Sequence, residues 1–190
     1  MNRRRFLVAL LYALLLFVPV FLIAAKRKAG RRRAFLRPPG ALEEARFKKQ
    51  CIGCFKCATA CPNQCIEMAG LEYGFENVFT PVIVPRRKGC TLCMRCTEVC
   101  PTGALQQVPR DLESVSRRVK MGTAHVDTDL CFSYFGRTCG VCYRACPLPG
   151  KAMRVGLYER PIVNADGCVG CGLCEQACIH MPQAIRVRPA

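Results

Sequence analysis

The stretch C51-I-G-C54-F-K-C57-A-T-A-C61, followed by Pro62, decides the fold, because its cysteine spacing returns further along the chain. Regular copies are C90-T-L-C93-M-R-C96-T-E-V-C100, followed by Pro101, and C168-V-G-C171-G-L-C174-E-Q-A-C178, followed by Ile179 in place of proline. A further copy, C131-F-S-Y-F-G-R-T-C139-G-V-C142-Y-R-A-C146, followed by Pro147, has five extra residues between its first two cysteines. In chain order these copies are units one to four, so residues 51–178 repeat one motif.

The spacing within each unit fits a [4Fe–4S] cube, which needs four thiolates, one for each iron. Three cysteines at i, i+3 and i+6 wrap a loop around one side of the cube. The fourth, before the proline, ligates the partner cluster in two-cluster ferredoxins. Proline there fixes φ and suits the first turn of a short helix. We therefore predict four [4Fe–4S] clusters. Their predicted iron ligands are Cys51, Cys54, Cys57, Cys61, Cys90, Cys93, Cys96, Cys100, Cys131, Cys139, Cys142, Cys146, Cys168, Cys171, Cys174 and Cys178.

Zinc sites and disulfides are the chemical alternatives for a chain with 17 cysteines. Zinc sites usually pair two C-x2-C knuckles across a longer gap, which differs from three cysteines at successive x2 spacing. A complete set of internal disulfides is excluded by the odd count, and the tight grouping disfavours a disulfide framework. Iron–sulfur clusters remain the best interpretation.

The stretched unit three keeps its first cysteine in register. Val126 stands five residues before Cys131, as Val163 stands five residues before Cys168. The extra residues can therefore form a loop, with Gly136 easing a turn, without moving a ligand. The alternative is that Cys131 is incidental and the site holds a three-iron cluster or none. The preserved register favours a full cluster.

Cys65 is the one cysteine outside the four units. It stands four residues after the last cysteine of unit one, where unit two has Ala104. A free cysteine behaves as a small hydrophobic residue in such a place, so we predict that Cys65 fills space beside a cluster. A role as an alternative ligand or redox thiol is the less favoured interpretation.

The fold predicted for residues 51–190 is α+β, with two tandem bacterial-ferredoxin-like modules. Each module would hold two [4Fe–4S] clusters and have pseudo-twofold symmetry. Short strands such as 161–163 and 184–187 are expected, with short helices after the clusters. V126-D-T-D-L-C131 parallels V163-N-A-D-G-C168, which suggests that unit three pairs with unit four and unit one with unit two. Nested pairing, one with four and two with three, remains open.

The N-terminal residues 1–25 predict a basic start and a transmembrane anchor. The apolar run from Phe6 to Ala25 is long enough for a helix of about 30 Å, the thickness of a bilayer core. N2-R3-R4-R5-F6-L7 also fits the twin-arginine export pattern. Residues 26–50 are expected to be a basic Pro/Gly linker near lipid. Their run of Lys and Arg favours the cytoplasmic side by the positive-inside tendency, so the two signals conflict over the membrane side.

The positive charge lies mainly at the N-terminal end, because residues 1–50 hold thirteen Lys and Arg against two acids. Each bound [4Fe–4S]²⁺ cluster with its four thiolates would add a charge of about −2 to the remainder. We therefore predict no nucleic-acid binding.

The chain has no glycine-rich nucleotide loop, and neither His125 nor His180 belongs to a catalytic arrangement. A catalytic function is accordingly not predicted.

Further features give the chain a family resemblance. The stretch L36-R-P-P-G-A41, the layout of four motifs, the run V-C-Y-R-A-C-P from Val141 to Pro147 and the stretched unit three resemble the NapG/MauM family across about residues 36–190. These are ferredoxin-type proteins associated with periplasmic nitrate reduction and methylamine oxidation.

The resemblance implies four [4Fe–4S] clusters and twin-arginine export, with the cluster domain on the periplasmic side of the cell inner membrane. It also implies electron transfer from a membrane quinol-oxidising, ferredoxin-like partner to a periplasmic cytochrome or oxidoreductase. The alternatives are an iron–sulfur maturation or scaffold protein, and an electron carrier on the cytoplasmic face.

Overall fold

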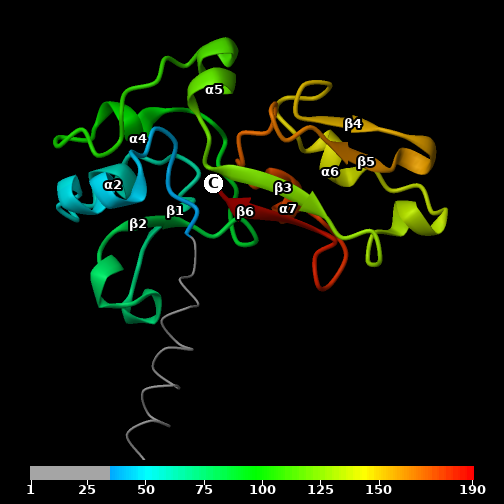
Figure 1. Ribbon diagram of the computed structural model, residues 1–190, viewed down its shortest axis with the longest axis horizontal. Coiled ribbons are helices and arrows are strands. Elements are labelled where there is room, and N and C mark those ends of the chain that lie inside the picture. Colours follow the sequence, from blue (N-terminus) through cyan, green and yellow to red (C-terminus); the bar gives the residue numbers. More distant parts are fainter. Residues whose placement is uncertain (1–34) are drawn as a thin grey trace, which may run out of the picture. The chain divides into compact units, whose positions relative to one another are not determined.

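The computed structural model describes residues 35–190, which belong to one compact unit (Figure 1). The predicted anchor at 1–25, the twin-arginine pattern and the first part of the predicted linker lie outside the described residues. Among residues 35–190, no helix is long and apolar enough to cross a membrane.

The first module, residues 35–108, contains units one and two. Its antiparallel hairpin pairs Ile66 with Ile83, and an isolated bridge joins Ala41 to Leu105, near the two ends of the module. The helix α3 packs against α4. The elements are α2 (Glu44–Gln50), α3 (Lys56–Thr59), β1 (Ile66–Met68), the 3₁₀ turns η1 (Leu71–Tyr73) and η2 (Phe75–Asn77), β2 (Pro81–Ile83) and α4 (Arg95–Glu98).

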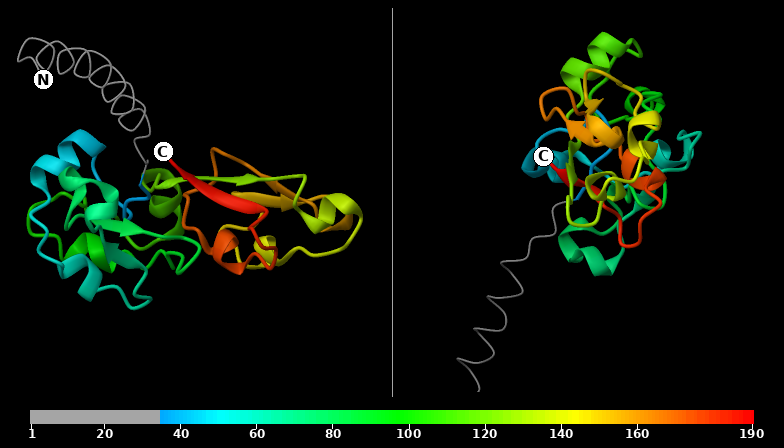
Figure 2. Two further views of the ribbon diagram at one scale, coloured as in Figure 1. Left: turned by 90° about the horizontal axis from the view of Figure 1, so that it is seen from below. Right: turned by 90° about the vertical axis from the view of Figure 1, so that its right-hand side faces the viewer.

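The second module, residues 121–190, contains units three and four. Strands β3 and β6 lie side by side and antiparallel (Figure 2), with Gly122 opposite Pro189, and β4 pairs with β5. The helix α5 (Leu112–Arg118) connects the modules. The elements of the second module are β3 (Gly122–Val126), η3 (Phe132–Phe135), α6 (Val141–Arg144), β4 (Met153–Val155), η4 (Leu157–Glu159), β5 (Pro161–Val163), α7 (Leu173–Ala177) and β6 (Ile185–Pro189).

This mixture of short helices and strands confirms the α+β prediction. The strands expected at 161–163 and 184–187 are β5 and β6. Buried side chains from both modules form one hydrophobic core that includes Leu36, Val115 and Ile185. The cysteine units are thus held by a continuous core.

The helices, however, do not follow the fourth cysteines as the sequence suggested. Each short helix starts one residue before the third cysteine of its unit, and the proline after the fourth cysteine lies in a turn or bend at Pro62, Pro101 and Pro147. The physical reason is a sharp left-handed turn just before each helix, which begins it inside the motif. The third cysteine is therefore helical, and the fourth emerges near the helix end.

The folded unit also begins earlier than the predicted linker boundary at residue 50. Leu36 pairs with Ile83, and Phe47 on α2 is completely buried. Arg37 is only 6% exposed, and it donates hydrogen bonds of 2.6 and 2.9 Å to the carboxylate of Glu44. The basic composition of this segment is typical of an exposed linker, but arginine can be buried where its charge is paired, as Arg37 is with Glu44.

Candidate metal centres

The cysteines of the four units meet around separate cavities, and in each cavity one thiol comes from the neighbouring unit. Three cavities are each lined by four cysteines from paired units. We name the groups after the unit that contributes three members: site I (Cys51, Cys54, Cys57 and Cys100), site III (Cys131, Cys139, Cys142 and Cys178) and site IV (Cys168, Cys171, Cys174 and Cys146).

The other cysteines of the four units are assigned to site II: Cys90, Cys93, Cys96 and Cys61. The side-chain amide of Asn63, two residues after Cys61, donates to the carbonyl of Gly89, next to Cys90, at 2.7 Å, so the end of unit one lies against the start of unit two. Unit one therefore exchanges its fourth cysteine with unit two, and unit three does so with unit four. Adjacent pairing is the arrangement in the structure, and the nested alternative is not.

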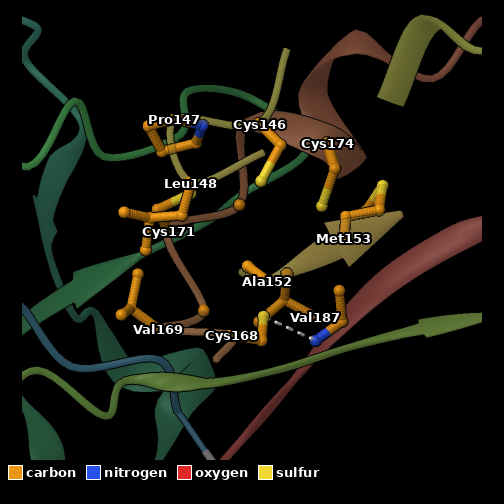
Figure 3. A pocket seen from close by; sticks show the side chains of 13 residues that line it. Cys146, Pro147, Leu148, Ala152, Met153, Cys168, Val169, Cys171, Cys174 and Val187 are labelled. Carbon is orange, nitrogen blue, oxygen red and sulfur yellow. Dashed lines mark hydrogen bonds between the residues drawn. The ribbon is translucent and has the colours of Figure 1, made fainter. Parts of the chain in front are cut away.

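Site IV shows how the thiols are arranged (Figure 3). Cys146, Cys168 and Cys174 direct their sulfur atoms into a common space, which Ala152 and Met153 help to enclose. The backbone N–H of Ala124 on β3 donates to Cys168 Sγ at 3.5 Å. Similar bonds of 3.4 Å run from Leu92 N–H to Cys90 Sγ and from Leu105 N–H to Cys100 Sγ. Hydrogen bonds to ligand sulfurs are among the features that set the potentials of iron–sulfur clusters.

The stretched unit three keeps Cys131 at its site, because this residue lines the same cavity as Cys139 and Cys142. The extra residues form the 3₁₀ turn η3, and Gly136 follows it with a φ of +76°. Phe135 in this insertion is 65% exposed. The loop has been lengthened without removing the first cysteine from the site, as its register predicted.

In every unit, the residue that follows the second cysteine has a left-handed conformation. In unit three the second cysteine is Cys139. The φ angles are +64° at Phe55, +57° at Met94, +57° at Gly140 and +82° at Gly172. This conformation turns the chain into the short helix that carries the third cysteine. Only the glycines are a sequence signal for it, since bulky residues rarely adopt positive φ.

The third cysteines of units one to three are buried, which strongly affects their acidity. Burial raises the pKa of Cys57 and of Cys142 to about 11 and that of Cys96 to about 12. Because iron binds the thiolate, occupation of these sites must displace protons.

The donor set fits an iron–sulfur cluster at each site. At sites I, III and IV the four thiols surround a space in an apolar setting, and a [4Fe–4S] cube distributes four thiolates over four irons. Thiolates are also the soft ligands that such clusters require.

Cys65 is buried beside site II. It is 3% exposed, and its counterpart Ala104 is 1% exposed, as expected for small residues that fill space. Its Sγ lies 3.5 Å from Cys61 Sγ. Cys65 thus contacts a thiol of site II, which sequence position alone did not reveal.

The two modules meet at the loops of sites II and IV. The N–H of Cys90 donates to the carbonyl of Cys171 at 2.7 Å, and the N–H of Gly89 donates to Gln176 Oε1 at 2.8 Å. Arg86, which the sequence did not single out, donates at 3.0 Å to the carbonyl of Cys178. A cysteine of site II and one of site IV are therefore joined by a direct backbone contact.

Comparison with known proteins agrees with these sites. A family model described as a 4Fe-4S dicluster domain matches residues 50–104 and 89–150, and a 4Fe-4S binding domain matches 165–178. The chain is 38% identical to ferredoxin-type protein NapG of Escherichia coli (strain K12) over 167 residues, which are 81% of this chain and 70% of that protein. The chain belongs to the NapG/MauM family. The methylamine utilization ferredoxin-type protein MauM of Methylophilus methylotrophus is 34% identical over 171 residues, 85% of this chain and 74% of that protein.

Another MauM, from Methylorubrum extorquens, is 39% identical over 165 residues, which cover 81% of this chain and 72% of the relative.

The two dicluster matches differ in their relation to the modules. The match to 50–104 coincides with the pairing of units one and two, whereas that to 89–150 crosses units two and three. The structure shows that unit three pairs with unit four, because Cys146 of unit three lines the cavity that the other cysteines of unit four surround.

Proposed function

We propose that this protein is a non-catalytic electron-transfer subunit that holds four [4Fe–4S] clusters, one at each of sites I to IV. The observation that carries the proposal is the reciprocal exchange of the fourth cysteine within each pair of units, which surrounds the described cavities with four thiols. Two-cluster ferredoxins use this exchange to hold neighbouring clusters. Membership of a ferredoxin-type family supports the same conclusion.

The order of the sites along the electron path is I, II, IV, III. Sites I and II share α3, which carries Cys57 and ends beside Cys61, and sites III and IV are related in the same way through α6. The modules meet where Cys90 of site II contacts Cys171 of site IV. Sites I and III are then the two ends, at which external partners would exchange electrons.

The donor we propose is a membrane quinol-oxidising, ferredoxin-like protein, and the acceptor is a periplasmic cytochrome or oxidoreductase. The protein would be anchored in the inner membrane by residues 6–25 and exported by the twin-arginine route. Support comes from the Arg-Arg pattern at residues 2–7, the apolar run and the family. The positive residues after this run favour the opposite side by the positive-inside tendency, and protease accessibility distinguishes the two.

A quinol-reduction assay tests the electron-transfer proposal. Membranes from cells that produce the full chain are treated with a reduced quinone analogue, and cluster reduction is followed by EPR. We expect reduced-cluster signals that are missing from membranes without the chain. Clusters that dithionite reduces but quinol does not would contradict the proposed donor. Rapid loss of the clusters to an added apo-ferredoxin would instead indicate a maturation protein.

Protease treatment of intact spheroplasts tests the membrane side. A C-terminal epitope is followed in the parent and in a variant with Arg3 and Arg4 changed to Lys, which blocks twin-arginine export. Digestion of the parent and protection of the variant are expected. Protection of both would place the cluster domain on the cytoplasmic face and remove the proposed periplasmic acceptor.

A further inference from the structure

We propose that Cys65 donates a hydrogen bond to the sulfur of Cys61 at site II and thereby raises the reduction potential of the cluster there. It would act as a positioning residue for electron transfer, without ligating iron. The inference rests on the proposed function, because it requires an iron–sulfur cluster at site II.

The geometry around Cys65 supports this role. Its Sγ lies 3.5 Å from Cys61 Sγ, within the range of hydrogen bonds that involve sulfur. An iron-bound Cys61 is a thiolate without a proton, so Cys65 is the donor in this pair. Cys61 is one of the four candidate ligands of site II, so this buried thiol directly contacts a ligand sulfur. At 3% exposure, water has little access to this thiol.

The other module positions provide an internal comparison. Ala104 occupies the equivalent position after unit two and lines the cavity of site I, but a methyl group cannot donate a hydrogen bond. The corresponding positions after units three and four are Gly150 and Pro182, which also lack a side-chain donor. Within the described residues, a thiol at this position is therefore specific to site II.

A donor near a ligand sulfur favours the reduced cluster, because the reduced state carries one more negative charge and gains more from the hydrogen bond. The change is a one-electron reduction in which the titrant supplies the electron and no protein bond forms or breaks. A typical hydrogen bond changes an equilibrium constant by about fivefold. At about 59 mV per tenfold for one electron, this corresponds to about 40 mV.

EPR-monitored redox titration of the purified full chain tests the inference. In Cys65→Ala we expect one midpoint potential to fall by about 40 mV while the other three stay unchanged. Cys65→Ser keeps a donor and should restore most of the shift. Cys65→Val keeps an apolar residue without a donor and should behave like the alanine variant. Ala104→Cys, which introduces a thiol beside site I, should raise the potential of a different cluster.

The outcomes separate this inference from the proposed function. Unchanged potentials in both Cys65→Ala and Cys65→Val would overturn the role of Cys65, provided that iron and sulfide contents match the wild type. Loss of one cluster in all three Cys65 variants would also overturn it, because Cys65 would then be a ligand. A wild-type chain without four clusters would instead refute the proposed function. If the alanine variant does not accumulate, the serine and valine variants still provide the comparison.

Discussion

Arg37 offers a stringent test of the folded unit, since the sequence suggested a linker at its position. Its guanidinium donates to Thr80 Oγ1 at 2.8 Å, to the carbonyl of Pro81 at 3.0 Å and to Asn77 Oδ1 at 3.3 Å. It also lies 4.8 Å from the centre of the Phe47 ring. These contacts join the segment before α2 to the strand β2 and the turn that precedes it. We predict that Arg37→Met strongly destabilises the protein.

The expected magnitude follows from the groups that would lose their partner. The acceptors of Asn77 and Pro81 are buried, and each buried group left unsatisfied costs about 1–3 kcal/mol. Thr80 keeps its bond to the carbonyl of Asn77. The half-exposed carboxylate of Glu44 can be hydrated, so its pair adds about 1 kcal/mol or less. The total is roughly 2–7 kcal/mol. For a chain of this size the melting temperature should fall by roughly 4–28 °C.

Thermal unfolding of the cluster-loaded protein, followed by circular dichroism, measures this effect. Arg117→Met is the matched control, because Arg117 is 72% exposed and, among residues 35–190, forms its ion pair with Glu113 one turn away. The control should lose about 0.5 kcal/mol or less. A loss for Arg37→Met as small as that of the control would refute the claim that residues 35–50 belong to the folded unit.

Three further predictions concern the sites and the folded segment. Cys61→Ser should disturb the cluster of site II and leave site I intact, as distinguished by the EPR signals of single-site variants; loss of site I alone would refute the exchange of fourth cysteines. Burial opposes ionisation of Glu44, but the hydrogen bonds and charge of Arg37 outweigh it, so its pKa is lowered from 4.5. The stabilising contribution of the Glu44 carboxylate should be full above pH 4.5 and disappear as the pH falls through the lowered pKa. The difference in unfolding free energy between the wild type and Glu44→Gln should therefore shrink in acid. A difference that stays constant with pH would contradict this. Gly172→Ala places a Cβ 2.6 Å from Pro85 Cβ, whereas Gly103→Ala meets nothing within 4 Å at a similar positive φ. Magnetic coupling between clusters of the two modules should weaken only in the Gly172 variant, and equal effects in both variants would argue against the proposed junction.

The candidate sites could be predicted closely because cluster geometry imposes a local spacing on the cysteines. Even the stretched unit three kept a recognisable register, through Val126 and Cys131. The pairing of units could not be decided in this way, since it depends on contacts between distant segments. The contact of Cys90 with Cys171, 81 residues away, was hidden for the same reason.

Other features were missed because residue type alone does not determine their environment. Phe55 and Met94 adopt left-handed conformations that their side chains disfavour, so the residue types at these positions do not predict the turn. Arg37 lies in a basic segment that is typical of an exposed linker. Its burial depends on acceptors such as Thr80, 43 residues further along the chain. Long-range partners of this kind become visible only in the folded structure.

The central claim is that the four groups of cysteines hold four [4Fe–4S] clusters. The most direct measurement is the iron and acid-labile sulfide content of the anaerobically purified full chain, combined with Mössbauer spectroscopy. We predict about sixteen iron and about sixteen sulfide per chain, four of each for every cluster, with spectra of the cubane type. Zinc in place of iron, or about half this content in a fully folded chain, would contradict the account.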